Sequence, residues 1–305
     1  MNKIAVQTGG PEERLGIDET YRMVKEWGFD AVDANIDHLL SGRSIVEGNI
    51  PQALIAGGED CMALFKPWAE AAKKYGVDNY QAHAPFPSLV HPVGSDINLR
   101  MLEVLKNMLR GCDLMDCRNL IIHPFFLGYD KQLSPEDEWN VNIESYAKLI
   151  PTAREYGVTV CLENMFTGYR GKIYAACCSD IDQACRMVDE LNALAGQRCF
   201  GFCLDTGHML LCGLDAYKTI TQLGSRISAF HIHDNDGRND QHLAPYMGIL
   251  DWERFIAGVR DIGFDRTLSF ETFNVWNSVH GEVMNEMMRF IAACGRMFAR
   301  RIAES

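Results

Sequence analysis

The chain has 305 residues, 47% of them hydrophobic, which is enough to bury the core of a single barrel-sized domain. Its 41 acidic and 29 basic residues give a net charge of −12, which argues against a nucleic-acid-binding surface, because such surfaces neutralise phosphates with Lys and Arg. We find no run of about 18 uncharged apolar residues and no apolar signal segment, so we expect no membrane span and a cytoplasmic location. The 11 Cys lack CxxC spacing and are expected to be reduced and mostly buried.

Strand-like and helix-like segments alternate along the whole chain. The predicted strands cover 3–8, 31–36, 80–85, 119–124, 158–164, 200–205, 227–233 and 267–272. Each is followed by a predicted helix, near 17–27, 60–75, 96–111, from about 135, 180–194, 215–223, 251–262 and 281–301. Strict alternation predicts a parallel sheet, and the count of eight favours an α/β fold of the (β/α)8 TIM-barrel type that spans 1–305 as one domain.

The connections differ in length between the two ends of the predicted barrel. Those from helix to strand take only a few residues, whereas those from strand to helix are long, at 37–59, 125–134, 165–179, 234–250 and 273–280. Long loops in compact domains are usually functional, and barrel enzymes keep their active sites at the carboxyl ends of the strands. We therefore expect the functional site at that end.

Residues that bind metals lie at the ends of six predicted strands. A lone His or Glu in such a place is usually solvated or structural, but six independent strand ends are difficult to explain in that way. Imidazole and carboxylate ligands without thiolates are typical of sites for zinc, manganese, cobalt or magnesium. The residues are His83, His123, Glu163, Asp205 with His208, His231 and Glu271.

Four of these residues, on neighbouring strands, form the predicted metal site. Adjacent strands lie about 4.8 Å apart, so Glu163, Asp205, His231 and Glu271 can converge on one divalent cation. His233 alternates with His231, so it should point between strand and helix and have a structural role. Phe86, Phe125, Phe166 and Trp276 follow the strand ends, where their rings either stack on a sugar or roof the barrel.

Short motifs around these residues resemble those of the xylose isomerase-like TIM-barrel superfamily, which includes ketose 3-epimerases, inosose dehydratases and apurinic-site endonucleases. The motifs are LEN at 162–164, DTGH at 205–208, HIHDND at 231–236, DQH at 240–242 and SFE at 269–271. The resemblance implies a metal-dependent isomerase or epimerase that acts on a ketose or keto-polyol through an enediolate. It implies Mn²⁺ or Zn²⁺, with Co²⁺ or Mg²⁺ as alternatives, and a small carbohydrate as the substrate.

The same resemblance implies roles for individual residues. Glu163, Asp205, His231 and Glu271 would bind the metal, and the two glutamates would also act as the acid/base pair. Contacts with the substrate would come from His83, His123, His208, Arg238 and His242.

Two other reactions remain open. A lyase of the keto-inositol dehydratase type would use the same ligands. The zinc-dependent apurinic endonucleases bind three zinc ions, and all nine of their ligand types occur in this chain, including Asp240 as a further metal ligand. The net charge and the acidic residues in the long loops favour the sugar over nucleic acid. The sequence leaves open whether the chain forms a homo-oligomer.

Overall fold

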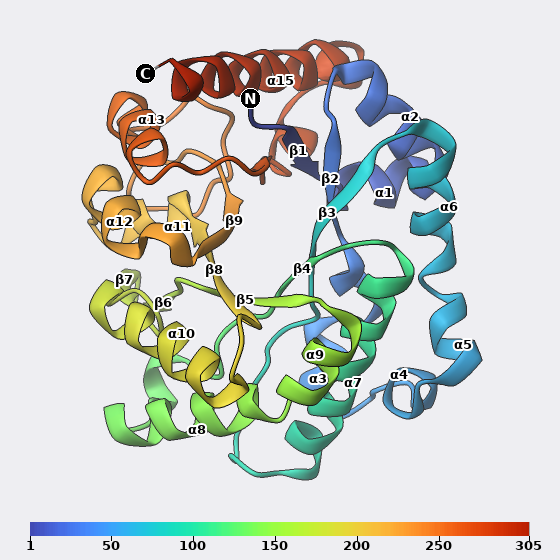
Figure 1. The fold of residues 1–305 in the computed structure, drawn as a ribbon, viewed down its shortest axis with the longest axis vertical. Helices are drawn as coiled ribbons and strands as arrows, with labels where there is room; N and C mark the ends of the chain where they lie inside the picture. Colours follow the sequence, from blue (N-terminus) through green and yellow to red (C-terminus); the bar gives the residue numbers. More distant parts are fainter. Residues whose placement is uncertain (305) are drawn as a thin grey trace.

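Eight parallel strands form the centre of the protein, which a computed structural model describes over residues 1–304 (Figure 1). Their order in the sheet is β10-β1-β2-β3-β4-β5-β8-β9. Backbone hydrogen bonds from Ile232 N to Ser269 O (2.8 Å) and from Glu271 N to Ile232 O (3.0 Å) join the two outer strands and close the barrel. The strands are β1 (Ile4–Gln7), β2 (Ala31–Ala34), β3 (Asp78–His83), β4 (Asn119–Ile121), β5 (Thr159–Glu163), β8 (Phe200–Asp205), β9 (Ile227–His231) and β10 (Leu268–Phe270).

An outer ring of helices covers the sheet, as the (β/α)8 prediction requires (Figure 1). Small buried side chains, Ile121, Cys161, Cys203 and Ala229, form a cluster of their own on four adjacent strands. All 11 cysteines are free, as predicted. The helices of the ring are α2 (Ile17–Trp27), α6 (Lys66–Tyr75), α7 (Asp96–Leu114), α8 (Pro135–Ala147), α9 (Ile150–Tyr156), α10 (Ile181–Ala195), α12 (Ala216–Leu223), α13 (Trp252–Asp261) and α15 (Gly281–Ala303).

The structure differs from the prediction inside several connections. The single helix expected over 60–75 is two helices, α5 and α6, because Pro67 lacks the N–H that an uninterrupted helix needs. The segment 165–179 contains a two-stranded hairpin, whose turn at Arg170 (φ 50°) and Gly171 (φ 73°) has the positive φ angles typical of tight hairpins. The additional elements are α1 (Gly9–Leu15), η1 (Ile36–Leu39), α3 (Gly42–Val46), α4 (Gln52–Ala56), α5 (Gly58–Ala63), η2 (Tyr129–Lys131), β6 (Phe166–Tyr169), β7 (Lys172–Ala175), α11 (Thr206–Leu211), η3 (Gly224–Arg226) and α14 (Val275–Ser278).

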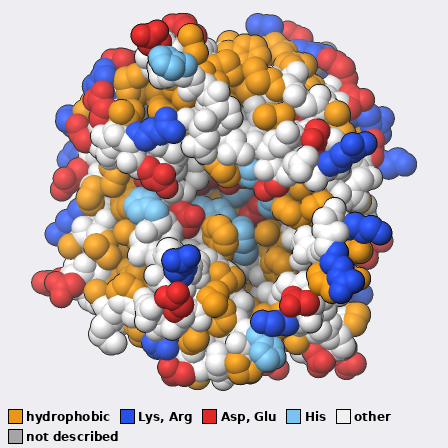
Figure 2. Space-filling view, turned by 180° about the vertical axis from the view of Figure 1, so that it is seen from behind, with side chains coloured by type: hydrophobic (Ala, Val, Ile, Leu, Met, Phe, Trp, Pro, Cys, Tyr) orange, Lys and Arg blue, Asp and Glu red, His pale blue; other side chains and the backbone are white. Residues whose placement is uncertain are grey.

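The long strand-to-helix segments surround the carboxyl ends of the strands. Figure 2 shows a hollow in the centre of one face, with histidine and acidic side chains at its floor and hydrophobic side chains around it. Within residues 1–304, no helix combines the length and the apolar character needed to cross a membrane.

Candidate functional site

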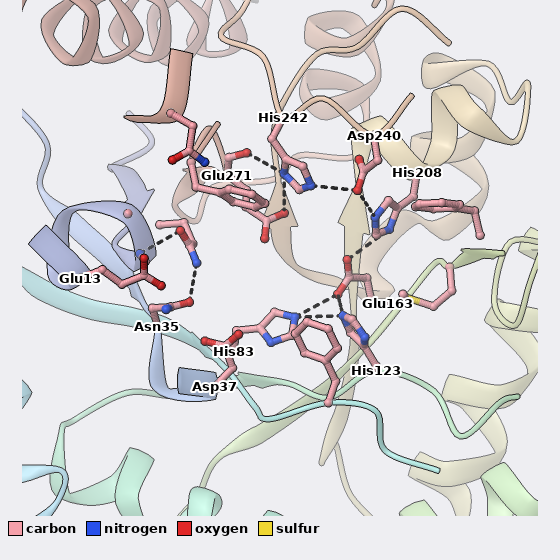
Figure 3. Close-up of a pocket in the computed structure, with 18 of the residues that line it drawn as sticks. Glu13, Asn35, Asp37, His83, His123, Glu163, His208, Asp240, His242 and Glu271 are labelled. Carbon is pink, nitrogen blue, oxygen red and sulfur yellow. Dashed lines mark hydrogen bonds and ion pairs between the residues drawn. The ribbon is translucent and has the colours of Figure 1, made fainter. Parts of the chain in front are cut away.

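A cavity of about 580 Å³ opens at the carboxyl ends of the barrel strands (Figure 3). Its volume lies within the range of ligand pockets, about 300–1,000 Å³. The structure therefore brings most of the predicted site residues to one place. The predicted residues in its wall are His83, His123, Glu163, His208, Asp240, His242 and Glu271.

The imidazole of His231 lies at the floor of the site, against three carboxylates. Its Nδ1 is 3.2 Å from Glu163 Oε1, 3.5 Å from Glu271 Oε2 and 4.0 Å from Asp205 Oδ2. All four side chains are buried. One nitrogen facing three carboxylate oxygens is the geometry that a ligand set adopts around a single cation.

Asp33 on β2 orients His231 from the other side of the ring. Its Oδ2 lies 3.0 Å from His231 Nε2 and accepts a hydrogen bond of 2.7 Å from the Gln81 amide. A carboxylate beside Nε2 favours a proton on that nitrogen, which would leave the lone pair of Nδ1 to a cation bound among the carboxylates. The sequence analysis missed Asp33, although an acidic residue inside the buried segment AVDANI is an unusual signal.

Asp205 is fixed by two neighbours. It caps α11 by accepting a hydrogen bond from His208 N (2.6 Å), and His233 Nε2 lies 3.0 and 3.1 Å from its two oxygens. His233 packs between the end of β9 and α11, where Gly207 leaves room for its ring. His233 thus points between strand and helix, as predicted, and the structure adds a contact with a proposed metal ligand.

His83 and His123 form a second group with Glu163. Their Nε2 atoms lie 3.0 Å apart, and 3.8 and 3.4 Å from Glu163 Oε2. His83 Nδ1 is 2.9 Å from the carbonyl oxygen of Ala84, which can only accept, so His83 Nε2 carries a lone pair. Glu163 Oε2 is buried and, among residues 1–304, accepts no hydrogen bond. The two Nε2 atoms and Glu163 Oε2 thus lie close enough together to bind one metal ion.

Asp240 joins two further histidines on the opposite side of the cavity. Its Oδ2 is 3.0 Å from His242 Nε2 and 3.7 Å from His208 Nε2. Nδ1 of each ring faces a backbone carbonyl, of Glu271 at 3.1 Å and of Asn164 at 2.9 Å. Burial and the neighbouring His233 lower the pKa of His242. For His208, Asp205 and Asp240 outweigh burial and raise the pKa to about 10.

The buried carboxylates and imidazoles of the site shift one another's pKa. Burial raises the pKa of Glu271 well above its usual range, and the charges of Asp205 and Glu163 add to this effect against the opposing His231. Burial disfavours a charged imidazole, yet Glu271, Glu163 and Asp33 raise the pKa of His231 well above its usual range. The arrangement therefore favours positive charge between these side chains, which a divalent cation would supply.

The donor set fits a divalent ion that accepts nitrogen and oxygen ligands. The residues placed to hold one are Glu163, Asp205, His231 and Glu271. Two neighbouring groups, His83 with His123 and Glu163, and His233 with His242 and Glu271, also have ligand atoms within 4.8 Å of one another.

Other predicted residues divide between the cavity and its surroundings. Phe86 and Phe166 line the cavity, together with Phe273, which was not predicted. Phe125 and Trp276 are buried in the core and do not line it. The structure does not bring Arg238 to the cavity: the residue is exposed, and its backbone N–H donates to Asp236 in the same loop.

Comparisons with known proteins agree with this architecture. The sequence profile of the family described as "Xylose isomerase-like TIM barrel" matches residues 21–294. The inosose isomerase of Bacillus licheniformis is 23% identical over 179 residues, which cover 57% of this chain and 60% of that protein.

Two solved structures superpose over nearly the whole chain. An L-ribulose 3-epimerase has 17% identity and a TM-score of 0.73, with 100% of this chain and 97% of that one covered. The IolI protein with a bound zinc atom has 16% identity and a TM-score of 0.72, with 99% and 100% covered. At these identities the likeness shows the fold.

Proposed function

Because the chain belongs to the family of xylose isomerase-like TIM barrels, we propose that it is a divalent-metal-dependent isomerase or epimerase of a ketose or keto-polyol. The observation that carries the proposal is the contact of His231 Nδ1 with oxygens of Glu163, Asp205 and Glu271. The names of the similar proteins, inosose isomerase and L-ribulose 3-epimerase, support the same class of reaction.

The proposed metal ligands are Glu163, Asp205, His231 and Glu271, with Zn²⁺ or Mn²⁺ as the expected ion. Bound there, a divalent cation polarises a substrate carbonyl and acidifies the adjacent C–H. The bound zinc atom of the similar IolI structure supports a metal in this type of site. Asp33 and His233 position two of the ligands from outside the cavity.

Glu163 and Glu271 are the proposed acid/base pair. They project from different strands, β5 and the end of β10, and both line the cavity. One carboxylate removes a proton from a carbon next to the carbonyl, and the other returns a proton to the opposite face. The imidazoles of His83, His123, His208 and His242 surround the space where substrate oxygens would bind.

The charge of the cavity wall supports a substrate without phosphate. Glu13 and Asp37 line the cavity in addition to the proposed ligands. Arg14 is the one Lys or Arg side chain of residues 1–304 in this wall. A phosphate dianion would face more carboxylates than cations, whereas a neutral polyol can donate hydroxyl hydrogens to them.

A second candidate is the zinc-dependent cleavage of abasic nucleic acid. The observation in its favour is that all nine implied ligands lie in or directly beneath the cavity, and that three groups of ligand atoms are present, two of which share Glu163. The net charge of −12 favours the sugar. A keto-inositol dehydratase, which would expel water after the same proton removal, differs from the epimerase only in its product.

Solvent-exchange NMR tests the proposal. Ketoses and keto-inositols are incubated with the protein in deuterated water, and we expect at least one to gain deuterium next to its carbonyl. Glu163→Gln and Glu271→Gln should each lower the exchange rate by at least about 100-fold. Metal content is measured in parallel, because both residues are proposed ligands. Glu190→Gln, an exposed glutamate on α10, is the matched control and should exchange normally. No exchange with any compound, together with cleavage of abasic DNA, would overturn the sugar reaction.

A further inference from the structure

A second cavity, of about 440 Å³, adjoins the first one. The two share three lining residues, Phe86, His123 and Met165. The Phe86 ring lies over His123, with ring centroids 4.5 Å apart, and meets His83 edge-on at 5.3 Å. The two cavities are therefore adjacent at Phe86 and His123, and we call the second one the annex.

The annex is lined mainly by apolar side chains. They come from the segments that follow β2, β3, β4 and β5, which are strand-to-helix connections on the functional face of the barrel. Two are exposed although they are apolar: Val46 at 60% and Phe86 at 42%. A hollow lined by apolar side chains suits a ligand with apolar faces. Other apolar residues of the wall are Leu89, Val90, Phe126 and Leu127.

The annex carries no excess of either charge. Asp130 and Lys131 are its acidic and basic residues, and both are exposed. The floor of the first cavity, by contrast, holds the carboxylates and imidazoles. The two cavities thus differ in chemistry: one suits hydroxyl and carbonyl oxygens, and the other suits an uncharged group with apolar faces.

We propose that the annex binds an uncharged ring joined to the reacting sugar, so that the substrate is a glycoside of a keto sugar. This inference rests on the proposed function, because it assigns the reacting ring to the first cavity. Both aromatic rings and the C–H faces of pyranose rings pack on side chains such as Phe126 and Phe86. The substituent contributes binding and takes no part in proton transfer.

The test compares two probes that differ only in the substituent: the methyl and the phenyl glycosides of one keto-hexopyranose. Calorimetry gives their dissociation constants with the metal-loaded protein, and solvent-exchange NMR gives their reaction rates. We expect the phenyl glycoside to bind about tenfold more tightly, because its ring is removed from water in the annex.

A variant that fills the annex provides the second arm. Val46→Trp places an indole there. Because Val46 is 60% exposed, we expect the variant to fold, and a thermal melt checks this. This variant should abolish the preference for the phenyl glycoside over the methyl glycoside. Leu194→Trp makes a similar change on α10, outside both cavities and at 57% exposure, and should keep the preference.

The outcomes separate this inference from the proposed function. Equal affinities of the two probes for the wild type would overturn the proposal that the annex binds the substituent. A preference that survives in Val46→Trp would overturn it as well. Exchange of both probes at equal affinity would support the proposed reaction and contradict the proposed role of the annex. A preference that Val46→Trp abolishes, without exchange of either probe, would support the annex as a binding site and count against the proposed reaction.

Discussion

Replacing Asp33 by Asn should weaken metal binding without unfolding the protein. The Asp33 carboxylate lies 3.0 Å from His231 Nε2 and is fully buried. An amide has nearly the same shape, and its oxygen can still accept the hydrogen bond from Gln81. It carries no charge, however, so it holds the imidazole proton on Nε2 less strongly. The proton can then move to Nδ1, the atom that faces the other proposed ligands.

The expected loss of metal affinity is about 10- to 100-fold, the usual effect of removing a group that orients a metal ligand. This corresponds to about 1.4–2.8 kcal/mol of binding free energy. The assay is a titration of metal-stripped protein with Zn²⁺ or Mn²⁺ in competition with a chromophoric chelator. Circular dichroism and a thermal melt establish that the variant is folded.

Asp78→Asn is the matched control. Asp78 lies at the start of β3, at the other end of the barrel, and its exposed carboxylate pairs with Lys3. The same chemical change there should leave metal affinity unchanged, because an exposed ion pair contributes little and does not reach the site. If Asp33→Asn bound metal as tightly as the wild type, His231 would not be a ligand that Asp33 holds in place.

Two further substitutions test the surroundings of the site. Burial raises the pKa of Glu12 to about 8, so its proton is bound more tightly in the folded state, and the unfolding free energy should fall as pH rises from about 4.5 to 8. Glu12→Gln keeps an acceptor for Trp68 and should remove this fall, on the order of 5 kcal/mol; equal pH dependence of denaturant unfolding in both proteins would refute it. Gly207→Ala places a Cβ on the His233 ring and should lower stability by about 1–3 kcal/mol and weaken metal binding, whereas Gly281→Ala, which has open space, should do neither. If Gly207→Ala left the melting temperature and the metal affinity unchanged, the position of the His233 ring beside α11 would not matter for either property.

The sequence predicts the barrel well because its elements follow local rules. Buried strands alternate with amphipathic helices, and the polar residues that end the strands, such as Glu163 and His231, are visible against apolar runs. The closing contact at Ile232 follows from the fold itself. The hairpin over 166–175 was missed because its two short strands are only partly buried and lack a strong hydrophobic pattern.

The supporting residues of the site could not be predicted in the same way. Asp33 and His231 are 198 positions apart in the sequence, and only the closed barrel brings their side chains into contact. No local sequence pattern therefore links the two. The contact of His233 with Asp205 depends on the space that Gly207 leaves in another element. The family resemblance implied a contact of Arg238 with the substrate, but the residue is exposed at the surface of its loop.

The central claim, a reaction that depends on one bound divalent ion, is tested most directly by measuring solvent exchange against metal content. Metal-stripped protein receives Zn²⁺ or Mn²⁺ in small portions while deuterium incorporation into a keto sugar is followed by NMR. The account predicts no exchange without metal and a plateau at about one ion per chain. Exchange that persists after complete metal removal would contradict it, as would a plateau at three ions with cleavage of abasic DNA.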